Sequence, residues 1–191
     1  MKKIVFIGLL ILFSQKDIAQ TIIPLEQYKT IWEANQGLPD NSYVKDLNNI
    51  MGRFLGTWRY NANGLAYIFI ITKETHTFFN VKADQLVINY TIGNISTGQL
   101  FVDTRKLSVT DEKITKGFMY YPEKDGFLFD YVYNEGCGQI GQLFIRQEAP
   151  TYIYLNLTLI GDTKPIIIDC GTDLNLTPPH NNRITLEKQT F

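Results

Sequence analysis

The sequence predicts an all-β protein, an antiparallel β-barrel of about eight to ten strands preceded by a short helix. Short apolar runs follow one another at nearly regular spacing, turn residues separate them, and strands do not alternate with helices. The clearest run is Tyr152–Leu159, in which Ile153, Leu155, Leu157 and Leu159 alternate with polar or phenolic residues. This spacing favours an antiparallel sandwich or barrel over parallel β–α–β units.

The predicted sheet begins in the stretch Met51–Lys73. Gly56-Thr57-Trp58 starts a strand, and Asn63-Gly64 suits a two-residue type I′ turn because both of its central positions need a positive φ. Leu65–Thr72 is apolar in both phases of a strand, which is typical of a strand buried on both faces or of one whose outer face the preceding helix covers. The stretch therefore predicts a β-hairpin whose second strand lies deep in the sheet.

Two helical segments are expected before this hairpin. Gln27–Ala34 predicts a short helix, which Gly37 and Pro39 end. Farther along, Asp40-Asn41-Ser42 supplies capping residues. Apolar residues then recur at steps of three and four, which places them on one face of a helix: Val44, Leu47, Met51 and Phe54. We expect this second helix to pack its apolar stripe against the sheet.

The remaining strands are predicted from the same period of two. They are expected at Leu86–Ile92, Leu100–Asp103, Gly117–Tyr121, Phe127–Tyr133, Ile140–Gln147, Pro165–Asp169 and Arg183–Gln189. Ser108–Ile114 is charged and is predicted to be a loop. Asp173–Asn182, which contains Pro178-Pro179, is predicted to be an exposed excursion.

Residues 1–19 have the pattern of a secretory signal peptide. Lys2-Lys3 is basic, Ile4–Phe13 is an apolar run too short to span a bilayer, and Ala19 is a small residue at the proposed cleavage site. The alternative is an N-terminal core strand or helix. We expect a signal peptide over residues 1–19 and a single β-barrel domain over residues 20–191. The expected location is periplasmic, outer-membrane associated or secreted, with no transmembrane span in the mature chain.

Charge and cysteine content exclude some partners and cofactors. The net charge of -1 and the lack of a Lys/Arg-rich run argue against nucleic acid as a partner. An even cysteine count in an exported chain favours one disulfide between Cys137 and Cys170, the alternative being two buried thiols. No C-x-x-C pair is present, and His76 and His180 are distant, so no metal and no cofactor is expected.

An aromatic set on neighbouring predicted strands supplies the candidate ligand-binding residues. Period two aligns the rings within each strand. If both faces point into a barrel, they line an apolar pocket with phenol donors that suits a small ligand. The set is Phe127, Phe129, Tyr131, Tyr133, Tyr152 and Tyr154. Trp58 is added as a seventh candidate, although it is better interpreted as a plug of the core. The alternative is core filling with cross-strand aromatic pairs, which is usual in small barrels.

Gly56-Thr57-Trp58, placed after a helical turn, resembles the G-x-W opening of lipocalins and related calycin barrels. In those proteins the glycine starts the strand and the tryptophan packs across the closed end of the barrel. The resemblance thus implies a calycin-like barrel with Trp58 packed at one end. The chain departs from lipocalins in showing no evident helix before its last strand.

The whole mature chain is also similar to a family of small exported proteins from flavobacteria that share a domain of unknown function. The matching features are Ala19-Gln20, Ile23-Pro24-Leu25, Phe54-Leu55-Gly56-Thr57-Trp58, Thr75-His76-Thr77-Phe78-Phe79-Asn80 and Thr185-Leu186-Glu187-Lys188. This resemblance implies an exported location and a fold, and it implies no activity.

Three functions stay open. The leading hypothesis is a non-enzymatic, monomeric module that binds a small apolar ligand or a protein partner. The second is a structural or interaction protein of the cell envelope that uses an exposed sheet face, such as the side carrying Tyr152 and Tyr154. The third is a hydrolase that uses His76. No catalytic motif surrounds this histidine, and its alternative role is a hydrogen-bonded ring at a strand end.

Overall fold

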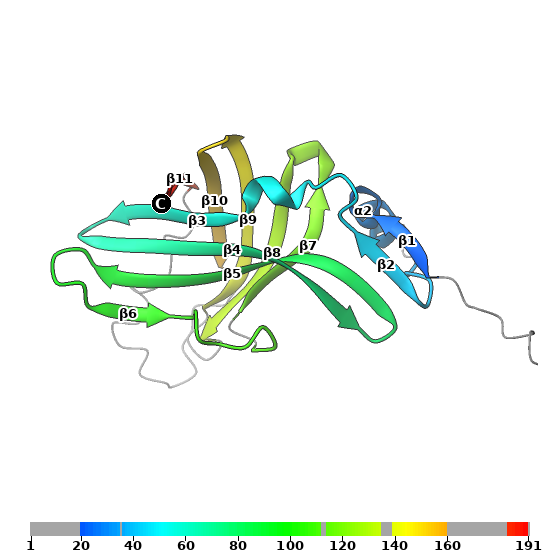
Figure 1. Ribbon diagram of the computed structural model, residues 1–191, viewed down its shortest axis with the longest axis horizontal. Coiled ribbons are helices and arrows are strands. Elements are labelled where there is room, and N and C mark those ends of the chain that lie inside the picture. Colours follow the sequence, from blue (N-terminus) through cyan, green and yellow to red (C-terminus); the bar gives the residue numbers. More distant parts are fainter. Residues whose placement is uncertain (1–19, 35, 112–113, 135–138, 160–182, 191) are drawn as a thin grey trace, which may run out of the picture.

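The computed structural model describes residues 20–34, 36–111, 114–134, 139–159 and 183–190 (Figure 1). The predictions for the leader, for the Cys137–Cys170 disulfide, for the strand Pro165–Asp169 and for the excursion Asp173–Asn182 lie outside the described residues. Within them, no helix has both the length and the apolar character needed to cross a membrane.

The central feature is a closed barrel of 8 antiparallel strands. Around the barrel the order is β5-β4-β3-β11-β10-β9-β8-β7, and a pairing between β5 and β7 closes the ring. The strands are β3 (Gly56–Ala62), β4 (Leu65–Phe78), β5 (Val81–Asn94), β7 (Thr115–Tyr121), β8 (Gly126–Asn134), β9 (Gln139–Ala149), β10 (Tyr152–Leu159) and β11 (Arg183–Lys188). The predicted all-β, antiparallel barrel with a short helix before it is confirmed.

The long strand β5 pairs with three different partners along one edge. Near its start, Lys82 and Ala83 pair in parallel with β2 (Ser42–Lys45). Its middle, Leu86–Ile88, pairs with β7, and its end pairs with β6 (Leu100–Asp103). In Figure 1, β4 and β5 run past the barrel to reach β2 at one side of the molecule, while β6 lies beside the other end of β5. The start of β5 therefore extends the sheet beyond the barrel.

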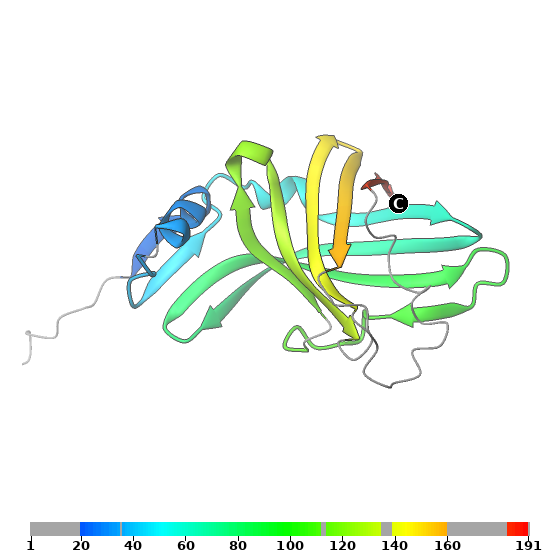
Figure 2. The ribbon, with the colours of Figure 1, turned by 180° about the vertical axis from the view of Figure 1, so that it is seen from behind.

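The N-terminal part forms a parallel β–α–β unit on this extension. β1 (Thr21–Pro24) pairs in parallel with β2, and α2 (Leu25–Glu33) connects the two strands. The helix predicted at Gln27–Ala34 is confirmed. The expectation that strands do not alternate with helices is wrong here, because the pattern of two strands of only four residues is too short to be recognised. Seen from behind in Figure 2, α2 lies beside β7, outside the barrel.

The second predicted helix, with its stripe of four apolar residues, is wrong. Val44 lies in β2, and only Met51–Phe54 is helical, as the short 3-10 helix η1. Val44, Met51 and Phe54 are buried as expected, but Leu47 is exposed. The chain turns between the two segments, with Asn49 at a φ of 53°, and the Asp46 carboxylate accepts hydrogen bonds from the backbone N–H groups of Ile50 and Met51. A strand and a helical turn thus bury three of the four residues that one helix would have buried.

The alternation predicted inside the barrel is largely confirmed. Ile153, Leu155 and Leu157 of β10 are buried, and Asn63-Gly64 forms the expected turn with φ values of 51° and 77°. In β4, Tyr67, Phe69 and Ile71 are buried, whereas the residues between them are partly exposed. Burial of Leu65–Thr72 on both faces is therefore wrong, since the alternate residues lie on the outer surface of the barrel.

Candidate functional site

The structure divides the seven predicted ligand-binding residues. Four of them lie together in the buried core: Trp58, Phe127, Phe129 and Tyr131. Tyr152 is exposed and Tyr154 lies on the outer surface, because β10 turns its aliphatic residues inward. The side chain of Tyr133 is outside the described part. As ligand-binding residues these seven stay a prediction, and the structure does not bring the two strand faces together.

The buried rings pack closely on one another. The ring centroids of Phe54 and Phe127 lie 5.3 Å apart in an edge-to-face arrangement, and those of Tyr120 and Phe127 lie 5.1 Å apart. The Tyr90 and Tyr131 hydroxyls approach to 3.3 Å within the core. These contacts are those of a filled aromatic core.

Trp58 is a central member of that core. Its side chain is fully buried, and its indole Nε1 donates a 2.8 Å hydrogen bond to the backbone carbonyl of Phe54 in η1. The Lys188 ammonium lies 5.1 Å from the ring centroid. Gly56, at the start of the same strand, has a φ of 127°, a conformation that favours glycine. Trp58 thus joins the 3-10 helix to the barrel core.

An apolar groove lies outside the barrel, between α2 and the extended sheet. Its volume is about 280 Å³ and its lining is mostly apolar. The helix side is formed by Tyr28, Ile31 and Trp32. The sheet side is formed by Val44 of β2, Ala83 and Val81 of β5, Phe78 at the end of β4 and Phe79 of the following turn. Gly37 and Leu38 complete the lining. The helix therefore covers this part of the sheet only partly.

Exposed aromatic rings stand at the mouth of the groove. Trp32 is 60% exposed and Phe78 39% exposed, and Phe79 is fully exposed. Phe79 also has a φ of 51°, which is uncommon for a bulky residue and costs free energy. Exposed apolar side chains gathered around a hollow mark binding sites more often than isolated ones do. We therefore take this groove as the candidate site.

Electrostatic contacts hold α2 in place over the groove. Lys29 forms a 2.6 Å ion pair with Glu123, which lies in the turn between β7 and β8, and a 3.4 Å ion pair with Glu33 one helical turn on. Leu25 and Tyr28 provide the buried face of the helix. Trp32, at the C-terminal end, is left facing the solvent and the groove.

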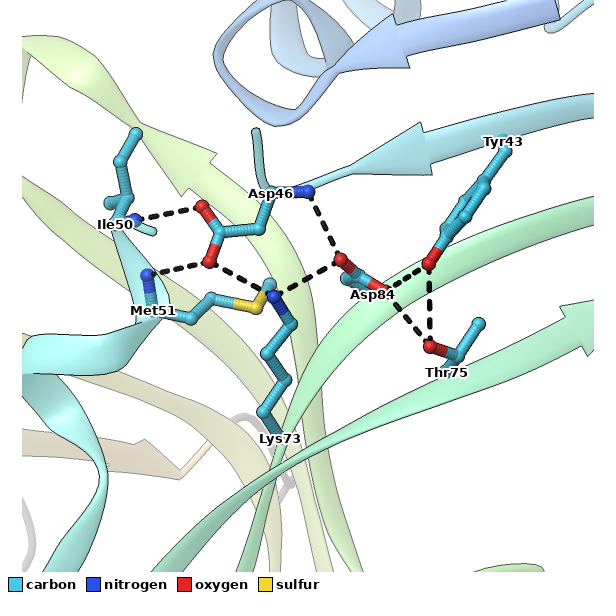
Figure 3. A network of polar contacts seen from close by, with 7 residues as sticks. All are labelled: Tyr43, Asp46, Ile50, Met51, Lys73, Thr75 and Asp84. Carbon is cyan, nitrogen blue, oxygen red and sulfur yellow. Dashed lines mark hydrogen bonds and ion pairs between the residues drawn. The ribbon is translucent and has the colours of Figure 1, made fainter. Parts of the chain in front are cut away.

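The strands that line the groove, β2, β4 and β5, also carry a polar cluster around Asp46 and Asp84 (Figure 3). Asp84 accepts hydrogen bonds from the Tyr43 hydroxyl at 2.7 Å, from the Thr75 hydroxyl at 2.9 Å and from the backbone N–H of Asp46 at 3.1 Å. The Lys73 ammonium lies 3.2 Å from a carboxylate oxygen of each aspartate. The cluster thereby connects β2, β4, β5 and the start of η1.

The cluster is suited to structure rather than to acid–base chemistry. Burial acts to raise the pKa of Asp84, but hydrogen bonds from Tyr43, the Asp46 backbone, Thr75 and Lys73 outweigh it and leave the pKa below its ordinary value. Burial likewise acts to lower the pKa of Lys73, and its contacts with Asp84 and Asp46 leave that pKa raised. Both groups are therefore held in their charged forms at neutral pH, with every carboxylate oxygen hydrogen-bonded or ion-paired.

Acid should destabilise the protein through this cluster. A carboxyl group with a depressed pKa in the folded state contributes stability above its unfolded pKa, which is about 4, and that stability is lost as the pH falls through the folded pKa. We expect the urea midpoint of unfolding to fall between pH 6 and pH 3. In Asp84→Asn the fall should be smaller. An equal fall in both proteins would assign the acid sensitivity to other carboxylates, such as Asp125 beside Arg53.

His76 lies on β4 with a partly exposed side chain. Its ring centroid is 4.6 Å from that of Phe78, in an edge-to-face contact. Within the described ranges, no hydrogen bond or ion pair joins the imidazole of His76 to another residue, although its backbone pairs with that of Ala83 in the sheet. The described chain likewise contains no group of three or more side chains that could hold a metal ion. In the described part of the chain, the histidine of the hydrolase alternative therefore has no hydrogen-bonded group to orient it.

Sequence reasoning missed the groove residues, above all Trp32, Phe78 and Phe79. A local signal for the two phenylalanines is their place directly before Asn80 at a turn, where apolar residues are unusual. The matching signal in the helix is Trp32, which follows Tyr28 by one turn and extends the apolar face beyond the buried residues.

No protein-family model matches this chain, and neither the curated proteins nor the solved structures with which it was compared include a significant match.

Proposed function

We propose that this is a binding protein whose ligand inserts an apolar group into the groove between α2 and the extended sheet. The observation that carries the proposal is an open, mostly apolar hollow ringed by Trp32, Phe78 and Phe79. Ligand sites are typically concave and largely apolar, and their volumes start near 300 Å³. The groove matches the lower end of that range, which suits a small ligand or the apolar part of a larger one.

The exposed rings supply the free energy for this binding. Covering roughly 100 Å² of apolar surface gives about 2.5 kcal/mol, or roughly 60-fold in affinity. The rings are held by the β4–β5 turn and by α2, which Lys29 ties to the barrel. A ligand therefore meets walls that are largely preformed, which limits the conformational entropy lost on binding.

We further propose that the protein works outside the cytoplasm as a monomeric module. The signal-peptide pattern of residues 1–19 and the resemblance to small exported proteins from flavobacteria support this location. The proposed ligand site therefore lies at the side of the barrel rather than in its interior. The proposed ligand is still a small apolar molecule.

Tryptophan fluorescence tests the groove directly. The sequence has 2 tryptophans, and Trp58 is buried, so a ligand-dependent change in emission should come from Trp32. We expect 1-octanol to shift the emission, and the shift to saturate. Ala83→Leu places a larger side chain in the groove and should weaken binding about tenfold or more.

Two phenylalanines give a matched pair for the same titration. Phe78, in the groove, is 39% exposed, and Phe101, on β6 away from it, is 40% exposed. Phe78→Ala should weaken binding several-fold, while Phe101→Ala should leave it unchanged. Equal affinities in Phe78→Ala, Ala83→Leu and the unaltered protein would refute the proposed function.

A further inference from the structure

We infer that the ligand of this groove is an amphiphile whose uncharged, hydroxyl-rich head group lies in a second hollow on the other side of Trp32. The inference rests on the proposed function, because it assigns the apolar part of the ligand to the groove. The second hollow has a volume of about 360 Å³ and lies between α2 and the outer surface of β7, β8 and β9.

The two hollows share one wall. Tyr28 and Trp32 line both of them, one helical turn apart on α2, with ring centroids separated by 6.2 Å. Tyr28 is buried and fixes the base of the wall, whereas the exposed Trp32 forms its outer edge. A ligand that passes over Trp32 therefore contacts the groove with one end and the second hollow with the other.

The linings of the two hollows differ in chemistry. The groove is mostly apolar, whereas the second hollow combines Met119, Tyr121 and Leu128 with the polar side chains of Lys116, Asp130 and Gln142. An apolar hollow beside a mixed one matches a ligand that is itself divided into an apolar tail and a polar head.

The polar side chains of the second hollow balance in charge. Lys116 of β7 is the register partner of Asp130 of β8, and Asp130 is in turn the register partner of Gln142 of β9. One cation, one anion and one amide thus lie in a row across three strands. Together they offer hydrogen-bond donors and acceptors without a net charge. This arrangement favours a head group with several hydroxyls over a lone carboxylate or ammonium, each of which would meet one like charge.

Four octyl compounds separate the contributions of tail and head. We would titrate octyl glucoside below its micellar concentration, 1-octanol, octanoate and octyltrimethylammonium against the full chain, following Trp32 emission. Octyl glucoside should bind about tenfold more tightly than 1-octanol, as one or two added hydrogen bonds would give. Both charged compounds should bind more weakly than octyl glucoside.

Substitutions in the second hollow complete the test. Gln142→Ala and Asp130→Ala should reduce the affinity for octyl glucoside to that for 1-octanol, without changing the affinity for 1-octanol. Asn156→Ala is the matched control, an exposed amide on the neighbouring strand β10 that lines a different hollow and should have no effect.

Each other outcome overturns a stated part of the argument. Equal affinities for all four compounds, or unaltered glucoside binding in Gln142→Ala and Asp130→Ala, would refute the amphiphile and leave the apolar groove in place. Failure of every compound to bind would refute both. A change in Trp32 emission with protein concentration alone, together with a dimer in sedimentation, would assign the groove to a second copy of the chain and also refute both.

Discussion

Replacing Trp58 with alanine should lower the free energy of unfolding by about 4 kcal/mol. The indole is fully buried, and its removal leaves a cavity among aromatic side chains that pack from several strands. The substitution also removes the hydrogen bond from Nε1 and leaves the carbonyl of Phe54 without that donor. Urea unfolding followed by circular dichroism measures the change without relying on tryptophan emission.

The second tryptophan provides the control. Trp32→Ala removes a side chain of the same size that is 60% exposed, and we expect the free energy of unfolding to change by less than about 0.5 kcal/mol. If the two alanine variants were equally stable, Trp58 would not have the packing role that its burial indicates. The comparison also shows whether Trp32 can be altered in ligand titrations without damage to the fold.

Replacing Asp84 with asparagine should cost about 3 kcal/mol. The amide nitrogen of asparagine cannot accept a hydrogen bond. In one orientation it faces the Asp46 backbone N–H and Lys73, and in the other it faces the hydroxyls of Tyr43 and Thr75. Either orientation leaves donors unpaired at a site where the carboxylate is nearly inaccessible. The loss should appear as a lower urea midpoint with an unchanged slope, because the same surface is exposed on unfolding.

Asp103→Asn is the matched variant for this second experiment. Hydrogen bonds from Arg105 lower the pKa of Asp103 to about 2. The Asp103–Arg105 pair is local in sequence and partly exposed to water, so its loss should change the free energy of unfolding by less than about 0.5 kcal/mol. A larger loss in Asp103→Asn than in Asp84→Asn would contradict the assignment of the structural role to the buried cluster.

The barrel was predictable because its strands are long enough to show their period. In β10, three consecutive inward positions are Ile153, Leu155 and Leu157, and all are buried. The turn at Asn63-Gly64 was predictable for a different reason, since few residues adopt a positive φ at two successive positions. Local chemistry therefore sufficed for both the strands and this turn.

The N-terminal unit was not predictable in the same way. β1 and β2 have four residues each, which is too few for a period to be distinguished from chance. β2 is placed by its pairing with β5, far along the chain, and β1 by its pairing with β2. The wrongly predicted helix has a different cause. Val44 and Phe54 fit a helical spacing, but the Asp46 carboxylate accepts hydrogen bonds from the backbone of Ile50 and Met51, and these bonds favour a turn between the two residues.

The candidate site was the least predictable part. Phe127 and Tyr131 were correctly placed on one face by the period of their strand, but that face belongs to the core, where Trp58 also lies. The groove requires that Trp32 and Phe79 line the same hollow, an arrangement that no local pattern encodes. A site formed between a helix and a distant hairpin can be found only once the pairing of the strands is known.

The way the barrel closes also determines when aggregation is most favourable. β3 meets β11 through the register pairs Trp58↔Lys188 and Arg59↔Glu187, which join residues far apart in the sequence. Until β11 is in place, β3 and β10 each present a row of unpaired backbone groups, and such edges pair readily with other chains. Because contacts between distant residues form slowly, closure is expected late in folding. Incompletely folded chains are thus the species most exposed to edge-to-edge association.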